Sequence, residues 1–291
     1  METELVGIIG GTGLGDSLAE QLADVEFRDV DTPFGRPSAA LMVGTLGGRR
    51  VAFINRHGPG HRFSPSEVPF AANVFALKKV GVHAIIASGA VGALQAEVVP
   101  GDLVIVDQFI DKTCKRTNSF FTGLAAVHCE MTEPVCPRLC RLLTRTGEDF
   151  DIKIRSHGTY VCMEGPQFST RAESLMHRAW GGDLVGMTAM PEAKLAREAQ
   201  ICYALVALVS DYDCWRSGDS SKGKHSLLKE IIANLQTATN NCLNLIKAAL
   251  ADKHELVCDD CICRKSLDLA VWTDRSKIDP ARKQTLKVLF E

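Results

Sequence analysis

The chain has 291 residues, with 33 lysines and arginines against 35 aspartates and glutamates, so its formal net charge is −2. A dedicated nucleic-acid binder usually carries a basic surplus, which is missing here, and disorder is disfavoured because 46% of the residues are hydrophobic. No apolar stretch approaches the ~18 residues of a membrane helix, so we expect neither nucleic acid nor a membrane as a partner.

The expected cell compartment follows from the start of the chain and from its cysteines. Met1-Glu2-Thr3-Glu4-Leu5 is acidic and lacks the features of a secretory signal. Most of the 11 cysteines are scattered singly through apolar context, as in proteins that keep reduced thiols. We expect a cytoplasmic location, with the nucleus as an alternative.

Short apolar runs alternate with helix-like patterns, which is typical of an α/β protein. The expected strands are Leu5–Ile9, Arg50–Ile54, His83–Ala87, Leu103–Val106 and Ala204–Val209. The expected helices are Glu67–Val80, Ser169–Trp180, Met190–Ala199 and Ser226–Leu250. We predict a single domain over residues 1–251, followed by an extension over residues 252–291 that is rich in charge and cysteine and ends in a short helix around Pro280–Leu289.

A glycine-rich turn follows the first expected strand. In Gly10-Gly11-Thr12-Gly13 the glycines let backbone N–H groups approach an anion, and the Thr12 hydroxyl adds a donor. The dinucleotide fingerprint fails because its third glycine position is Asp16. The turn is therefore a candidate anion site, with a tight turn that binds nothing as the alternative.

Two further turns follow the next expected strands, where α/β sheets place ligands. Arg56 offers a planar fork that matches phosphate, and His57 lies beside it; a solvated surface turn is the alternative. Metal binding by His57 and His61 is disfavoured because the Gly-Pro-Gly between them cannot be helical. Ser88-Gly89-Ala90 predicts a turn of small residues, which either meets a ligand or only packs closely.

Two carboxylates stand at the end of the last expected strand. Asp211 and Asp213 face the same side if the strand pattern persists, and such a pair can hold and donate one proton. A turn with a helix cap is the alternative. Phe168 and Met187 precede expected helices, and for them core packing is the alternative to substrate contact.

Seven segments of the chain form an ordered set. They are Gly-Gly-Thr-Gly-Leu (10–14), Thr-Pro-Phe-Gly-Arg-Pro-Ser (32–38), Arg-His-Gly-Pro-Gly-His (56–61), Pro-Gly-Asp-Leu-Val-Ile-Val-Asp-Gln-Phe-Ile-Asp (100–111), Glu-Gly-Pro-Gln-Phe-Ser-Thr-Arg-Ala-Glu-Ser (164–174), Gly-Met-Thr-Ala-Met-Pro-Glu (186–192) and Asp-Tyr-Asp-Cys-Trp (211–215). The set resembles the nucleoside phosphorylase-I superfamily, and within it the trimeric 5′-methylthioadenosine phosphorylases. The resemblance implies a three-layer α/β/α fold around a central mixed, twisted β-sheet.

The resemblance also implies an activity, the phosphorolysis of 5′-methylthioadenosine to adenine and 5-methylthioribose 1-phosphate in purine and methionine salvage. Inorganic phosphate is then a co-substrate, and neither a metal nor an organic cofactor is needed. The residues implied to bind phosphate are Thr12, Arg56, His57, Ser88, Gly89, Ala90 and Thr188. Those implied to bind the nucleoside are Phe168, Ser169, Met187, Asp211, Tyr212 and Asp213, with Asp211 as the catalytic acid that protonates purine N7.

Asp211 bears on the choice of base, because a carboxyl group that donates to N7 can also accept from a 6-amino group. Relatives specific for 6-oxopurines carry Asn at the matching place, so we expect adenine-type substrates. Gly89 and Gly186 stand where close relatives carry Thr and Asn.

For the pocket of the 5′ substituent, the resemblance indicates five residues, of which His128 reaches a neighbouring subunit and Leu289 belongs to a hydrophobic tail. They are His128, Lys224, His225, Leu228 and Leu289. Methylthio-specific relatives line this pocket with valines, whereas a His there is similar to purine nucleoside phosphorylases that bind a 5′-hydroxyl. A broader phosphorylase that accepts adenosine or inosine is therefore the alternative. Sites at subunit edges imply a homotrimer.

Two questions stay open at this level. Cys258, Cys261 and Cys263 are one thiolate short of a structural zinc site unless His254 joins, and free thiols are the alternative; some thermophilic relatives carry a Cys-x-Cys disulfide near their end. A nucleoside-binding protein without catalysis is the alternative from another class, but Arg56 and Asp211 are both present, which favours an enzyme.

Overall fold

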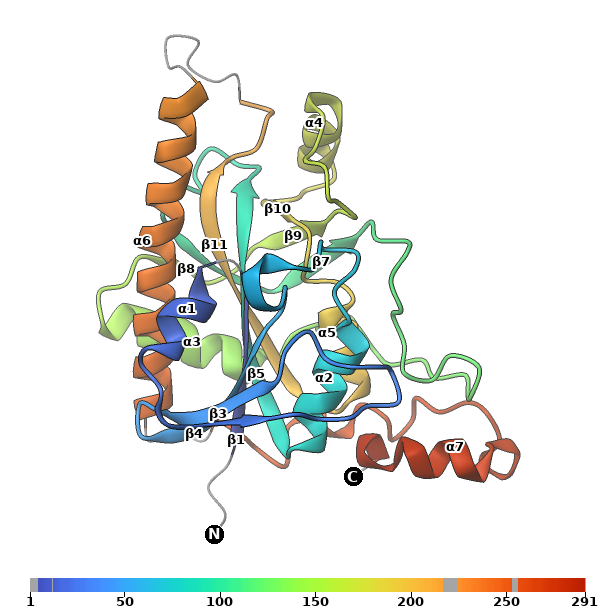
Figure 1. Ribbon diagram of the computed structural model, residues 1–291. Helices are drawn as coiled ribbons and strands as arrows, with labels where there is room; N and C mark the ends of the chain where they lie inside the picture. The colour runs from blue at the N-terminus through green and yellow to red at the C-terminus, as the bar shows by residue number, and fades with distance from the viewer. Residues whose placement is uncertain (1–4, 12, 217–223, 253–255, 291) are drawn as a thin grey trace.

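The structure is a computed structural model that describes residues 5–11, 13–216, 224–252 and 256–290. These residues form one eleven-stranded mixed sheet with helices on both faces (Figure 1). Helices α1, α3 and α6 lie on one side, and α2 and α5 on the other (Figure 1). The expected α/β class and mixed sheet are confirmed. No helix in the described ranges is long and apolar enough to cross a membrane.

The strands that the structure describes include all five expected from the apolar runs. In chain order they are β1 (Leu5–Gly10), β2 (Ala23–Arg28), β3 (Leu41–Leu46), β4 (Arg49–Asn55), β5 (Val82–Ala93), β6 (Leu103–Val106), β7 (Gln108–Asp111), β8 (Ile154–Arg155), β9 (Thr159–Cys162), β10 (Leu184–Gly186) and β11 (Cys202–Tyr212).

The helices overlap the expected ones, and α1 and α3 are additional. They are α1 (Leu14–Ala19), α2 (Phe70–Lys79), α3 (Pro137–Asp149), α4 (Arg171–Ala179), α5 (Glu192–Glu198), α6 (Lys224–Ala251) and α7 (Pro280–Thr285). Short 3₁₀ helices are η1 (Pro59–His61), η2 (Ile262–Lys265), η3 (Arg275–Lys277) and η4 (Lys287–Phe290).

Strand β5 is the centre of the sheet. It pairs in parallel with β1 and β11 and, near its end, antiparallel with β10. The turn predicted at Ser88-Gly89-Ala90 is wrong, because β5 continues to Ala93 and β11 pairs with it from Ala84 to Ala93. Small residues suit this stretch because its neighbours are close: a Cβ added at Gly92 would lie 3.3 Å from Cβ of Asp213.

Four parallel strands gather the candidate residues at one edge. Strands β4, β1, β5 and β11 run in the same direction, so their carboxyl ends meet there. Gly10 ends β1, Arg56 directly follows β4 and Asp211 is the next-to-last residue of β11. Ser88 lies in the middle of β5, just past Ala87, which pairs with Ile9 near the end of β1.

The C-terminal residues return to the opposite end of β11, at the bottom of Figure 1. Val271 bridges to Val127, and Nε2 of Gln200, just before β11, donates to the Leu289 carbonyl at 3.0 Å. Leu256 and Leu289 are both fully buried in the main hydrophobic core. The extension therefore packs as part of the fold.

Candidate active site

Arg56 lies directly after β4 and is fully buried. Its Nε and Nη2 donate to the two carboxylate oxygens of Glu192 at 2.8 and 2.9 Å, and its Nη1 donates to the Ser88 carbonyl at 2.8 Å. A guanidinium has five N–H donors, so two stay without a partner among the described residues. The solvated surface turn is therefore excluded, and the buried cation keeps donors for an anion.

Glu192 is the first residue of α5 and is not among the site residues predicted from the sequence. Tyr203 on β11 donates to the same carboxylate at 2.8 Å. Burial alone would lower the pKa of Arg56, but the attraction of Glu192 outweighs it and the pKa is raised. The sequence did contain a signal for Glu192, because this residue ends the segment 186–192 that carries the family resemblance.

The glycine turn and the middle of β5 surround this guanidinium. A Cβ added at Gly11 would lie 3.0 Å from Arg56 Nη1 and 3.7 Å from the Gly89 Cα, so both backbones pass close to the cation. The Ser88 hydroxyl is buried and has no partner in the described ranges. A Cβ added at Gly89 would lie 3.3 Å from Thr188 Oγ1. Ala90 follows on β5, and Thr12 lies outside the described residues.

His57 is buried beside this centre, and its ring stacks on that of His61 with the centroids 4.1 Å apart. Its Nδ1 lies 2.8 Å from the Phe63 carbonyl oxygen, which can only accept, so Nδ1 carries a proton. Burial lowers the pKa of His57 to about 4, helped by the charge of Arg56 and opposed by the Phe63 hydrogen bond. The ring is therefore neutral near pH 7, and its Nε2 is an acceptor.

Asp211 and Asp213 stand at the end of β11. The Ser210 hydroxyl donates to Asp211 Oδ1 at 2.6 Å. Burial raises the pKa of Asp211, the Ser210 hydrogen bond lowers it and the charge of Asp213 raises it, with a raised pKa as the net result. Oδ2 of Asp213 is buried without a partner in the part of the chain that the structure describes. The charge of Asp213 therefore acts on Asp211. That the pair holds and donates one proton stays a prediction.

The side chain of Tyr212 points away from the carboxylates of Asp211 and Asp213. Its hydroxyl donates to the Ala96 carbonyl at 3.2 Å, and its ring meets Trp215 edge to face. This follows from the alternation of side chains along a strand. A role for Tyr212 beside Asp211 and Asp213 stays a prediction.

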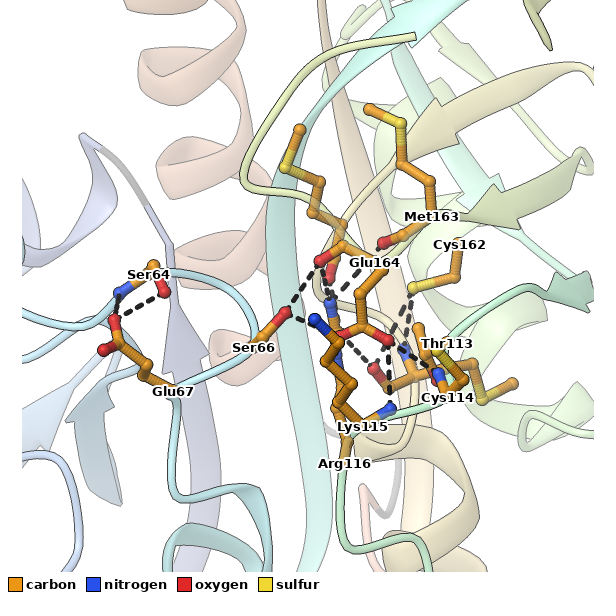
Figure 2. A network of polar contacts seen from close by, with 12 residues as sticks. Ser64, Ser66, Glu67, Thr113, Cys114, Lys115, Arg116, Cys162, Met163 and Glu164 are labelled. Atoms are coloured by element: carbon orange, nitrogen blue, oxygen red, sulfur yellow. Dashed lines mark hydrogen bonds and ion pairs between the residues drawn. The ribbon is translucent and has the colours of Figure 1, made fainter.

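A second buried arginine, Arg116, connects the loops expected to hold the nucleoside (Figure 2). Its Nε donates to Glu164 Oε1 at 3.1 Å, and its Nη2 donates to the carbonyl oxygens of Glu164 and Met163 at 2.7 and 3.4 Å. Its Nη1 donates to the carbonyl oxygens of Met187 and Met190 at 2.6 and 2.5 Å. Arg116 lies outside the seven segments that carry the family resemblance.

The Glu164 carboxylate is held from several sides, as Figure 2 shows. The Ser66 hydroxyl donates to it at 2.5 Å and the backbone N–H of Cys114 at 2.6 Å. Burial would raise the pKa of Glu164, but these hydrogen bonds, with those from Lys115 and Arg116, lower it to about 2. Glu164 is thus a fixed anion that positions the loop beginning at Gly165.

That loop leads into α4 and contacts two other segments of the candidate site. A Cβ added at Gly165 would lie 2.7 Å from the sulfur of Met187, so Met187 lies against this glycine. The carbonyl of Ser169 accepts from Cys214 Sγ at 3.2 Å, next to Asp213 in the chain. Thr170 and Glu173 then form the capping box that starts α4. Phe168 is 84% exposed, so it is not part of the core.

The fold explains why residue 186 is a glycine. A Cβ added there would lie 2.0 Å from the hydroxyl of Tyr160, which fills the space. The same hydroxyl accepts from the Thr188 backbone N–H at 3.3 Å. Tyr160 therefore occupies the place of a larger side chain and holds the segment that carries Met187 and Thr188.

The residues predicted for the 5′ pocket do not gather around Asp211 within one chain. Leu289 is fully buried at the Gln200 end of β11, ~30 Å from the Asp211 end by strand geometry. His128 is exposed and binds the extension through its backbone N–H. His225 and Leu228 are exposed on the first turns of α6, and the side chain of Lys224 lies outside the described residues. Their pocket role stays a prediction.

Comparison with known proteins gives one consistent answer. The sequence profile of the phosphorylase superfamily matches residues 5–251. The S-methyl-5′-thioadenosine phosphorylase of Gloeobacter violaceus is 42% identical over 289 residues, which cover 98% of this chain and 94% of that protein.

Two solved structures extend the likeness to three dimensions. A methylthioadenosine phosphorylase from an antarctic soil metagenomic library has a TM-score of 0.88 and 40% identity, covering 99% of each chain. A mutant adenosine/methylthioadenosine phosphorylase from Schistosoma mansoni, in complex with adenine, has a TM-score of 0.78 and 35% identity, covering 86% of this chain and 91% of that one. The chain therefore belongs to the phosphorylase superfamily and, within it, to the methylthioadenosine phosphorylases.

Proposed function

We propose that the protein catalyses the phosphorolysis of 5′-methylthioadenosine to adenine and 5-methylthioribose 1-phosphate. The observation that carries the proposal is the placement of two groups at one edge of the sheet. Arg56 is a buried cation with donors to spare, and Asp211 is a carboxyl whose pKa is raised. Phosphorolysis needs both an anion site and a proton donor.

In the reaction, a phosphate oxygen forms a bond to C1′ of the ribose while the bond from C1′ to N9 of the purine breaks. The electron pair of that bond passes to the purine, which becomes basic. Asp211 gives its proton to N7, and free adenine leaves. The phosphate is held by the spare N–H groups of Arg56, the Ser88 hydroxyl, the backbone of Gly89 and Ala90, and Thr188. His57 is neutral, so its Nε2 accepts from a protonated phosphate oxygen.

The proposal includes the base and the assembly. Adenine is favoured because a protonated Asp211 donates to N7 while its other oxygen accepts from the 6-amino group, and a relative of similar fold binds adenine. His128 binds the extension through its backbone N–H, away from Asp211 within the chain, so its proposed contact with the 5′ substituent requires a neighbouring subunit in a homotrimer. No cofactor beyond the co-substrate phosphate is part of the proposal.

A second candidate is a broader phosphorylase that also accepts 5′-hydroxyl nucleosides. The observation that favours it is a polar, exposed His225 at the start of α6, where methylthio-specific relatives are expected to have valine. One of the similar structures is also named for both adenosine and methylthioadenosine.

The test measures phosphate-dependent release of free base from methylthioadenosine, adenosine and inosine in parallel. We expect methylthioadenosine to be preferred, whereas comparable turnover of adenosine would support the second candidate. Asp211→Asn, which removes the proton, should lower turnover ~10²–10⁴-fold. Asp149→Asn, at an exposed aspartate on α3, is the matched control and should leave turnover unchanged. Adenine binding without any turnover in the unmodified protein would instead indicate a nucleoside-binding protein.

A further inference from the structure

Four cysteines from distant parts of the sequence meet at the end of β11 opposite Asp211. Cys136 precedes α3, Cys202 begins β11, and Cys261 and Cys263 lie at η2 in the extension. Their sulfur atoms all lie within 4.8 Å of one another, and those of Cys136 and Cys261 are 3.7 Å apart. All eleven cysteines, each within the described ranges, are free thiols.

This spacing matches the ligands of one tetrahedral ion. Zinc held by four thiolates has Zn–S bonds of ~2.3 Å, which places neighbouring sulfur atoms ~3.8 Å apart. Cys136, Cys202 and Cys263 are buried and Cys261 is half-buried, so the cluster is closed to solvent on most sides. Structural zinc sites are closed in this way and have four protein ligands.

The surroundings supply the charge that such a site needs. Four thiolates and one Zn²⁺ carry a net charge of −2. Nη2 of Arg138 lies 4.0 Å from Cys202 Sγ and donates to the Leu256 carbonyl at 2.8 Å, so it brings a cation to the cluster and contacts the extension. A hydrogen bond also holds the extension next to the cluster: Ser266, which follows Cys261 and Cys263, donates its hydroxyl to the Arg197 carbonyl at 2.5 Å.

We propose that Cys136, Cys202, Cys261 and Cys263 bind one zinc ion that fastens the C-terminal extension to the core. Binding replaces four thiol protons with the metal and involves no oxidation. The ligand set differs from the one considered from the sequence: Cys258 is not in the cluster, and His254 lies outside the described residues. Because Cys202 is ~30 Å from the Asp211 end of the strand, the ion is structural.

The first experiment uses the untagged full-length protein, purified with a thiol reductant and without chelators. We expect about one zinc per chain by elemental analysis, and X-ray absorption should show four sulfur ligands at ~2.3 Å. The proposal is overturned if the reduced protein stays free of metal after incubation with zinc, or if peptide mapping of freshly isolated protein finds these cysteines in disulfides.

Variants then assign the ligands. Cys261→Ser/Cys263→Ser should lose the zinc and make the extension sensitive to limited proteolysis. Cys258→Ser, in the same extension but outside the cluster, is the matched control and should keep both zinc and protection. Zinc retained by the double variant would refute the assignment.

If the double variant does not fold, cobalt replaces zinc in the unmodified protein. We expect the intense sulfur-to-cobalt charge-transfer bands and the visible bands of tetrahedral Co²⁺, with one equivalent saturating them. Octahedral cobalt without thiolate bands would overturn the proposal.

Discussion

Two buried arginines, each paired with a glutamate, organise different parts of the site edge. Arg116 uses all of its N–H donors on Glu164, Met163, Met187 and Met190. Arg56 uses three donors on Glu192 and Ser88, and the rest have no partner among the described residues. A saturated arginine fixes loops, whereas an unsaturated one is prepared for a ligand that carries negative charge.

The largest effect is expected from Arg56→Met. It removes the cation from a buried pair, and the uncompensated Glu192 should cost about 3–5 kcal/mol of unfolding free energy. Loss of the anion donors should lower kcat/KM for phosphate by on the order of 10³. Chemical denaturation and steady-state kinetics measure the two effects.

A double variant separates the effect on stability from the effect on activity. Arg56→Met/Glu192→Met should recover most of the stability, because an apolar pair often replaces a buried ion pair without loss. It should not recover activity. Arg141→Met, at an exposed arginine on α3, controls for the loss of a charge. Restored phosphorolysis in the double variant would contradict a phosphate role for Arg56.

Arg116→Met should have the next largest effect, and its kinetic signature should differ. The carbonyl and carboxylate acceptors lose their donor, so stability should fall by about 2–3 kcal/mol. Because the displaced loops carry Met187 and Ser169, KM for the nucleoside should rise more than KM for phosphate. An equal rise in both constants would show that the two arginines do not have separate roles.

The same contrast shows what a single sequence can and cannot predict. Arg56 and Asp211 were selected as candidates because a charged residue directly after an apolar run marks a strand end, which is local information. Glu164 and Arg116 are 48 residues apart. Cys136 and Cys261 are 125 apart. Only the folded chain shows that these residues meet, since nothing in the spacing of either residue identifies its partner.

One prediction was wrong because small residues within a strand were interpreted as a turn. Ser88 and Gly89 were expected in a turn, yet they continue β5. A run of small residues does not distinguish a turn from a closely packed strand, because tight turns and close approach of backbones both require small side chains. The additional helix α3 and the short strands β7 to β10 were missed, since they are short or amphipathic and carry no strong apolar run.

Ser210→Ala tests the proposed role of Asp211 as the proton donor. The Ser210 hydroxyl stabilises the ionised form of Asp211, so its loss should raise the pKa of Asp211 further. If protonated Asp211 is the active form, activity falls as pH rises through this pKa. The alkaline limb of the kcat profile should therefore move to higher pH in the variant. A limb that stays in place would assign it to another group.

The smallest effect is expected from Glu164→Gln, and it depends on pH. The hydrogen bonds to Glu164 lower its pKa to about 2 from an ordinary value of 4.5. A lowered carboxyl pKa contributes stability that is fully present above pH ~4.5 and is lost as the pH falls toward 2. At pH 7 the variant should therefore melt below the unmodified protein, and this difference should shrink steadily below pH ~4.5. Glu148→Gln, at an exposed glutamate on α3, should show no such convergence. A constant gap across this range would mean that Glu164 stabilises the loops through neutral hydrogen bonds and not through its charge.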